Sequence, residues 1–220
     1  MTPGTLYVVA TPIGNLEDIT LRALRVLREV GLVACEDTRR TRTLLTHFGI
    51  HVPVTSYFEH NKMAKGPAIL KALREGKSVA LVTDAGTPGI SDPGFLLVRE
   101  AREAGIPVVP VPGPSAVVAA LSAAGIPADS FVFDGFLPVK PGKRIHRLEA
   151  LRELQMTLVC YESPHRILAA LEAIGQVFGQ AEIVVARELT KQFEEIVRGT
   201  PEALRERFAA GTVRGEFTLV

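Results

Sequence analysis

Short apolar runs alternate with amphipathic segments along the first half of the chain. The apolar runs are bounded by turn residues, a pattern typical of buried parallel strands, and lie at residues 6–10, 32–35, 53–58, 79–82 and 108–111. Helical patterns separate them at residues 21–30, 42–48, 62–75 and 94–104, with Thr20 as the N-cap of the first. This alternation predicts a mostly parallel sheet with right-handed crossovers.

The second half follows a different pattern, because several of its strands succeed one another with little or no helix between them. Strands are expected at residues 131–137, 157–161, 183–187, 193–198 and 215–220. Helices are expected at residues 115–124, 144–154, 167–178 and 201–208. The pattern predicts a mixed sheet. We therefore expect two α/β domains, residues 1–113 and 114–220, joined at the stiff segment PVPGPS.

Composition narrows the class of protein. Hydrophobic residues make up 47% of the chain, yet no apolar run approaches the length of a membrane helix, and no basic leader precedes the first strand. Cys35 and Cys160 lie inside apolar runs, so we expect reduced thiols, no metal site and a cytoplasmic protein. With a net charge of +1, contact with nucleic acid would depend on a local basic patch.

One long loop stands out, at residues 83–94 with the sequence TDAGTPGISDPG. It follows a buried strand, at the end where open α/β sheets place their ligands. Its glycines allow a ligand to approach the backbone, and its prolines hold the shape of the loop. Asp84 offers a carboxylate to hydroxyls or amines, and Ser91, Asp92 and Pro93 are typical of a helix start.

Four further loops with unusual residues follow predicted strands. Together with residues 84–92, the loops at residues 11–15, 36–42, 112–116 and 161–166 are expected to converge on one cleft between the domains. Neither a nucleophile elbow nor a dinucleotide fingerprint occurs, which makes a nicotinamide-dependent oxidoreductase a poor alternative. The pattern favours chemistry that holds two substrates in line.

Seven motifs appear in register along the chain: TPIGNLEDIT, EDTRRTRTLL, TDAGTPGISDPG, VPGPSA, YESPHR, ARELTK and GEF. Together they resemble the family of small-subunit (16S) ribosomal RNA cytidine 2′-O-ribose methyltransferases, in the tetrapyrrole methylase superfamily. The resemblance covers essentially the whole chain. The first position of the third motif departs from the usual serine, with Thr83 in its place.

The resemblance implies a two-domain α/β methylase that works as a homodimer and binds S-adenosylmethionine in the cleft between its domains. Its substrate would be a cytidine ribose in the decoding region of 16S ribosomal RNA, within the small ribosomal subunit. The cofactor loops of the family fall on Pro12, Asp84, Ala85, Gly86, Thr87, Pro88, Ile90, Ser115, Ala116, Tyr161, Ala186 and Leu189.

A ribose hydroxyl is a poor nucleophile until a base draws off its proton. The candidates for this base are Glu36, Asp37 and His60, and Asp37 is preferred because it ends a strand beside a run of arginines. The alternative is that Glu36 and Asp37 only pair with those arginines in a helix-capping cluster. The resemblance does not decide between these interpretations.

Basic residues supply the candidates for RNA contact. They are Arg39, Arg40, Arg42, Lys62 and Lys65 in the first half, and Lys140, Lys143, Arg144 and Arg147 in the second. Relatives commonly continue past the last strand into a small helical tail, which we do not expect here, since the sequence stops at Val220 within that strand. The alternative functions are another C- or N-methylating enzyme of the superfamily, and a non-catalytic assembly factor that binds S-adenosylmethionine or RNA.

Overall fold

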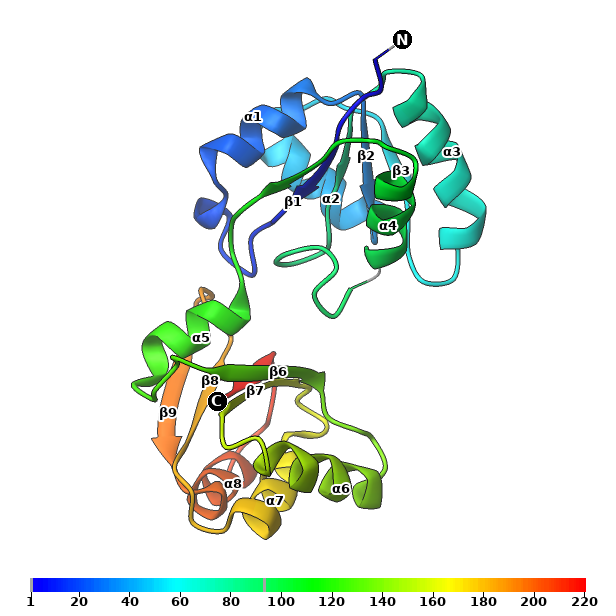
Figure 1. The fold of residues 1–220 in the computed structure, drawn as a ribbon. Helices are drawn as coiled ribbons and strands as arrows, with labels where there is room; N and C mark the ends of the chain where they lie inside the picture. Colours follow the sequence, from blue (N-terminus) through cyan, green and yellow to red (C-terminus); the bar gives the residue numbers. More distant parts are fainter. Residues whose placement is uncertain (1, 93) are drawn as a thin grey trace. The chain divides into compact units, whose positions relative to one another are not determined.

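A computed structural model describes residues 2–92 and 94–220 of the chain (Figure 1). The chain divides into two compact units, the first ending at Ser115 and the second spanning Ala116–Val220. Each unit has its own sheet and its own buried core.

The first unit is built on a five-stranded sheet whose strands are all parallel, as the alternating pattern predicts. The strand order is β3-β2-β4-β1-β5. The strands are β1 (Leu6–Val9), β2 (Leu32–Cys35), β3 (Val54–Ser56), β4 (Val79–Leu81) and β5 (Val108–Val111). Leu6 lies opposite Val79 of β4 on one side and Val108 of β5 on the other, so β1 is an inner strand, and the fully buried β4 is the central strand of the sheet.

Helices cover both faces of this sheet, giving three layers (Figure 1). Side chains of α1 (Leu21–Glu29) and α2 (Thr38–His47) share one core cluster, and those of α3 (Lys62–Arg74) and α4 (Phe95–Glu103) share the other. A short 3₁₀ turn, η1 (Leu16–Asp18), precedes α1. The N-cap predicted for α1 is confirmed, because the Thr20 side chain accepts a hydrogen bond from the Ala23 amide.

The second unit contains a mixed sheet with the order β6-β7-β10-β8-β9, which confirms the prediction for this half. Strands β6 (Phe131–Phe136) and β7 (Thr157–Glu162) are parallel, whereas β8 (Ile183–Arg187), β9 (Glu195–Gly199) and β10 (Phe217–Leu219) add antiparallel pairs. Its helices are α5 (Ala116–Ala124), α6 (Pro141–Arg152), α7 (Ile167–Phe178) and α8 (Pro201–Ala209).

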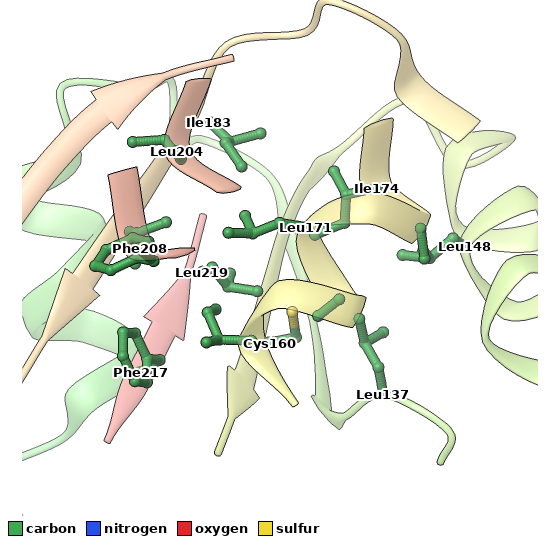
Figure 2. Close-up of a cluster of buried hydrophobic side chains, with 14 of the residues drawn as sticks. Leu137, Leu148, Cys160, Leu171, Ile174, Ile183, Leu204, Phe208, Phe217 and Leu219 are labelled. Atoms are coloured by element: carbon green, nitrogen blue, oxygen red, sulfur yellow. The ribbon is translucent and has the colours of Figure 1, made fainter. Parts of the chain in front are cut away.

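The core of the second unit lies between the sheet and helices α6, α7 and α8. Leu148, Leu171 and Phe208 from these helices meet Cys160 and Leu219 from the strands (Figure 2). Both cysteines of the chain are free and buried, as expected for reduced thiols. Within residues 2–92 and 94–220, no helix is both long and apolar enough to cross a membrane.

Three helix starts differ from the expectation. Helix α2 begins at Thr38, one turn before residue 42, because Asp37 caps it. Helix α4 begins at Phe95 with Gly94 at its N-cap, so Ser91 and Asp92 are not its caps, and Pro93 lies outside the described residues. Helix α6 begins at Pro141, since proline is favourable in a first helical turn, and not at residue 144.

Candidate active site at the carboxyl edge of the parallel sheet

The carboxyl end of β4 is the centre of the candidate site. Strands β1 and β2 flank β4, and both lead into helices on one face of the sheet, whereas β4 leads into α4 on the other face. The chain therefore leaves neighbouring strands in opposite directions on both sides of β4. Such switch points open the crevice in which α/β sheets bind ligands.

The loop at residues 84–92 is fastened to the loops that follow β1 and β5. Thr11 and Gly86 exchange two backbone hydrogen bonds, of 2.9 and 3.0 Å, and the Thr11 hydroxyl donates to the Thr83 carbonyl at 3.0 Å. The Thr87 hydroxyl donates to the Pro114 carbonyl at 3.4 Å. Gly86 has a φ of +87°, a left-handed conformation that favours glycine. These contacts fix the loop before any ligand arrives.

The tip of this loop turns tightly, and most of its residues are exposed. Gly89 has a φ of +84°, and a Cβ atom on Gly94 would lie only 3.0 Å from the Gly89 nitrogen, so the loop folds back tightly on itself. Ser91 also has a positive φ, of 60°, which is a strained conformation for a residue with a side chain. Ala85, Gly89 and Ile90 are exposed and Thr87 is half-buried, whereas Pro88 is buried.

Asp84 joins this loop to the one that follows β2. Its Oδ1 atom accepts a hydrogen bond of 3.0 Å from the Asp37 amide, and its Oδ2 atom lies 3.4 Å from the Arg40 guanidinium. The sequence predicts Asp84 as a ligand for the cofactor. The structure adds a positioning role, because the same carboxylate orders the first turn of α2.

Asp37 forms the N-cap of α2. Its Oδ1 atom accepts from the Arg39 amide at 2.8 Å, and its Oδ2 atom lies 3.0 Å from the Arg39 guanidinium. The hydrogen bond from the Arg39 side chain, helped by that from its amide, lowers the pKa of Asp37 to about 2. A carboxylate with so low a pKa is a weak base. The geometry of Asp37 is therefore that of a helix cap paired with an arginine, the alternative to a role as the base.

The pKa of the adjacent Glu36 is shifted in the opposite direction. It is half-buried, and burial followed by the negative charges of Asp92 and Asp84 raises its pKa above the ordinary value. Burial also raises the pKa of Asp92, for which the sequence pattern predicts only a role at a helix start. Its place in the same long loop as Asp84 is the sequence signal that could have identified it as a site residue.

His60, the third candidate base, follows β3 at the same edge of the sheet and is exposed. Its ring lies 6.3 Å from that of Phe58, in an edge-on arrangement. Among the basic residues of the first unit, Arg39, Arg40, Arg42 and Lys65 are exposed, while Lys62 is half-buried and pairs with Glu59 at 2.5 Å. The three exposed arginines named here all lie on α2, which begins at the candidate site.

The remaining cofactor candidates are distributed over both units. Pro12 is buried in the loop after β1, and Ser115 and Ala116 are half-buried where the two units join. In the second unit Tyr161 packs against Phe133 and Phe136, while Ala186 and Leu189 are buried. The convergence of residues 161–166 and 186–189 with the first unit on one cofactor cleft stays a prediction.

A backbone irregularity follows β8, next to the candidates Ala186 and Leu189. Glu188 and Thr190 have positive φ angles of 49° and 67°, which few residues other than glycine adopt. The Glu188 carboxylate accepts from the Glu216 amide at 3.0 Å and from Lys191 at 2.8 Å, and these bonds hold the turn. Strain of this kind is often concentrated at ligand sites.

Two basic residues of the second unit are not arranged as expected. Arg144 is only 4% exposed, and its guanidinium donates to the carbonyls of Pro138 and Val139, so it does not present its charge to a partner. This corrects its assignment as an RNA contact. Arg147 is exposed but its guanidinium pairs with Asp134, whereas Lys140 and Lys143 are exposed.

Sequence comparisons place the chain among methyltransferases. Residues 5–205 match the family of tetrapyrrole (corrin/porphyrin) methylases. The chain is 53% identical to the ribosomal RNA small subunit methyltransferase I of Mesorhizobium japonicum, over 97% of this chain and 74% of that protein. It is 57% identical to the protein of the same name from Pseudomonas aeruginosa, over 89% of this chain and 70% of that one.

Comparison with solved structures finds the same fold. A cobalt precorrin-4 methyltransferase matches with a TM-score of 0.72 at 22% identity, over 98% of this chain and 93% of that one. A diphthine synthase matches with a TM-score of 0.75 at 17% identity, over 99% of this chain and 89% of that one. At this level of identity, the likeness concerns the fold alone.

Proposed function

Because the chain belongs to the family of tetrapyrrole methylases, we propose that it transfers a methyl group from S-adenosylmethionine to the RNA of the small ribosomal subunit. The observation that carries this proposal is identity of about one half, over nearly the whole chain, to proteins named ribosomal RNA small subunit methyltransferase I. The motif resemblance supports the finer assignment, the ribose 2′-hydroxyl of a cytidine in the decoding region. It also supports a cytoplasmic homodimer.

The carboxyl edge of the first sheet fits such a cofactor in its chemistry. S-adenosylmethionine carries amino, carboxylate and hydroxyl groups, which exposed backbone groups and a carboxylate can bind. The loop at residues 84–92 offers the exposed residues Ala85 and Gly89, and Asp84 offers its carboxylate. When bound, the cofactor supplies an electrophilic methyl group on a positively charged sulfur. No positively charged metal is required to activate it.

Among the candidate bases, we favour Glu36 over Asp37. The base must take the proton of the ribose hydroxyl as the new oxygen–carbon bond forms, and a base with a pKa nearer to neutral does this better. Burial and neighbouring carboxylates raise the pKa of Glu36, whereas Arg39 lowers that of Asp37. The exposed Arg39 and Arg42 remain candidates for binding RNA phosphates beside this base.

The test is transfer of radiolabelled methyl from S-adenosylmethionine to small ribosomal subunits that lack the modification. Nuclease digestion then shows whether the label lies on a ribose and in which nucleotide. Label on a cytidine ribose is the expected result. Label on a base would refute the 2′-hydroxyl assignment, and absence of label from RNA despite tight cofactor binding would favour a different methyl acceptor or a non-catalytic role.

A further inference from the structure

The segment between β6 and α6 of the second unit is an exposed loop with firmly held ends. Leu137, at its start, is 1% exposed and belongs to the core, and so does Leu148, further along α6 (Figure 2). Pro138 and Pro141 restrict the backbone between them. By contrast, Val139 at the tip is 71% exposed.

Two arginine side chains donate hydrogen bonds to backbone carbonyls of this loop. Arg144 donates from Nε to the Pro138 carbonyl at 3.1 Å and from its terminal nitrogen to the Val139 carbonyl at 3.0 Å. Arg166 donates to the Leu137 carbonyl. Three consecutive carbonyls of the loop are thus held by two guanidinium groups.

The carboxylate of Glu162 completes this cluster. It lies 3.1 Å from the Arg166 guanidinium and accepts a hydrogen bond of 2.8 Å from the Ser163 amide, and its side chain is fully buried. Buried ion pairs contribute little net stability, because removing the charges from water offsets their attraction. The specific result of this arrangement is the fixed shape of residues 137–140.

The exposed residues in and beside this segment are apolar or cationic. Phe136 and Val139 are exposed large hydrophobic residues, and Lys140 and Lys143 are exposed close to them in the chain. Within the part of the chain that the structure describes, neither lysine forms an ion pair, whereas Arg147 is paired with Asp134. Free ammonium groups beside apolar side chains match the phosphates and the sugar or base faces of RNA.

We propose that residues 137–140 and the first turn of α6, residues 141–143, form a preformed RNA-contact segment, in which Lys140 and Lys143 bind phosphates. Arg144, Arg166 and Glu162 are positioning residues that act through the loop backbone and do not touch RNA. The proposal rests on the proposed function for the identity of the partner, and it adds a contact site in the second unit. A rigid loop lowers the entropy cost of binding, which explains why buried charges support it.

The direct test compares the double variant Lys140→Ala/Lys143→Ala with Arg205→Ala, which removes an exposed positive charge from α8 of the same unit. Binding of unmodified small subunits is measured by filter retention across a salt series. Losing two phosphate contacts should weaken binding by roughly tenfold or more and lower the salt slope by about 2. The turnover number at saturating subunits should stay unchanged. A double variant that matches Arg205→Ala would overturn the proposal.

The positioning role is tested with Arg144→Met and Arg144→Lys. The first removes both hydrogen bonds to the loop, and the second keeps a charge that reaches only one carbonyl at a time. We expect KM for subunits to rise in Arg144→Met and to be intermediate in Arg144→Lys, with little change in turnover number. Hydrogen exchange at residues 137–143 should accelerate in parallel. Wild-type KM in a folded Arg144→Met variant would contradict the positioning role, and if that variant does not fold, Arg144→Lys decides.

Failure of this proposal is distinguishable from failure of the proposed function. If the wild type labels RNA but the lysine variant binds subunits normally, the loop proposal alone is wrong. If the wild type transfers no methyl yet binds 16S ribosomal RNA in a lysine-dependent manner, the methyltransferase proposal fails and the contact loop stands. Titration with S-adenosylmethionine serves as the control, since the double lysine variant and the Arg144 variants should bind it like the wild type.

Discussion

Two neighbouring acids, Glu36 and Asp37, differ in chemistry because of what surrounds each carboxylate. Asp37 turns to the start of α2 and is held by Arg39, whereas Glu36 is half-buried near Asp84 and Asp92. The hydrogen bonds stabilise the charged form of Asp37, and burial destabilises the charged form of Glu36. At the residue scale, environment therefore distinguishes a structural acid from a candidate base.

The variant Glu36→Gln should lower the turnover number by about 10²-fold or more, because it removes the group that accepts the ribose proton. In the wild type, kcat/KM should rise with pH through the pKa of Glu36, which lies above the ordinary 4.5, since only the ionised carboxylate is a base. This rise of kcat/KM with pH should be absent in Glu36→Gln. The measurement is the rate of RNA labelling as a function of pH.

Asp37→Asn is the matched control. Asparagine is also a good N-cap, so α2 should be preserved and the turnover number should stay within about threefold of the wild type. Cofactor binding should be unchanged in both variants. Loss of turnover in a folded Asp37→Asn variant, together with an active Glu36→Gln variant, would return the role of base to Asp37.

At the scale of single elements, helix starts determine where the functional side chains lie. Moving the start of α2 from residue 42 to Thr38 places Arg39 and Arg40 on the first helical turn, beside Asp37 and Asp84. Moving the start of α6 to Pro141 places Arg144 on the same helix face as the buried Leu148 and Leu151. A capping side chain, that of Asp37, sets the start of α2, whereas α6 starts at a proline without a side-chain cap.

The cap of α1 gives a direct test of this effect. Thr20→Ala removes the oxygen that accepts from the Ala23 amide at 3.1 Å, and we expect a loss of about 1 kcal/mol in the free energy of unfolding. The midpoint of urea denaturation measures it. Thr43→Ala is the control, because the Thr43 hydroxyl only donates to the Arg39 carbonyl inside α2. An equal loss in both variants would argue against a specific capping contribution.

At the scale of the whole molecule, each unit carries its own hydrophobic core. In the first unit the parallel sheet is covered on both faces, by the core clusters that contain Leu27 and Leu73. In the second unit the helices that contain Leu148, Leu171 and Phe208 cover one face of the mixed sheet (Figure 2). A core of its own is the physical requirement for a unit to open separately from its neighbour.

Leu171→Ala should lower the stability of the second unit by about 2–5 kcal/mol, because Leu171 is fully buried in that core. Native-state hydrogen exchange should then accelerate within Ala116–Val220 and stay near wild type in the first unit. Leu27→Ala, buried in the first unit, should give the reverse pattern. Equal acceleration in both units by either variant would show that they unfold as one.

The alternation of apolar runs and amphipathic segments was sufficient to predict the class of both sheets and every strand in the described part of the chain. The information is local, because a strand or helix is recognised by the spacing of its own apolar residues. The long loop after β4 was identified in the same way, from breakers that no regular structure tolerates. Family membership also followed from the sequence, since the motifs occur in order along nearly the whole chain.

Only the tertiary structure decided which charged groups meet. Asp84 accepts a hydrogen bond from the Asp37 amide across 47 positions of the chain, and after burial and the charge of Asp92 its own negative charge helps to raise the pKa of Glu36. Likewise, the exposed Lys143 and the buried Arg144 are adjacent in sequence and have the same charge. Their difference depends on carbonyl groups of another segment, because hydrogen-bond partners and burial arise from folding and not from residue type.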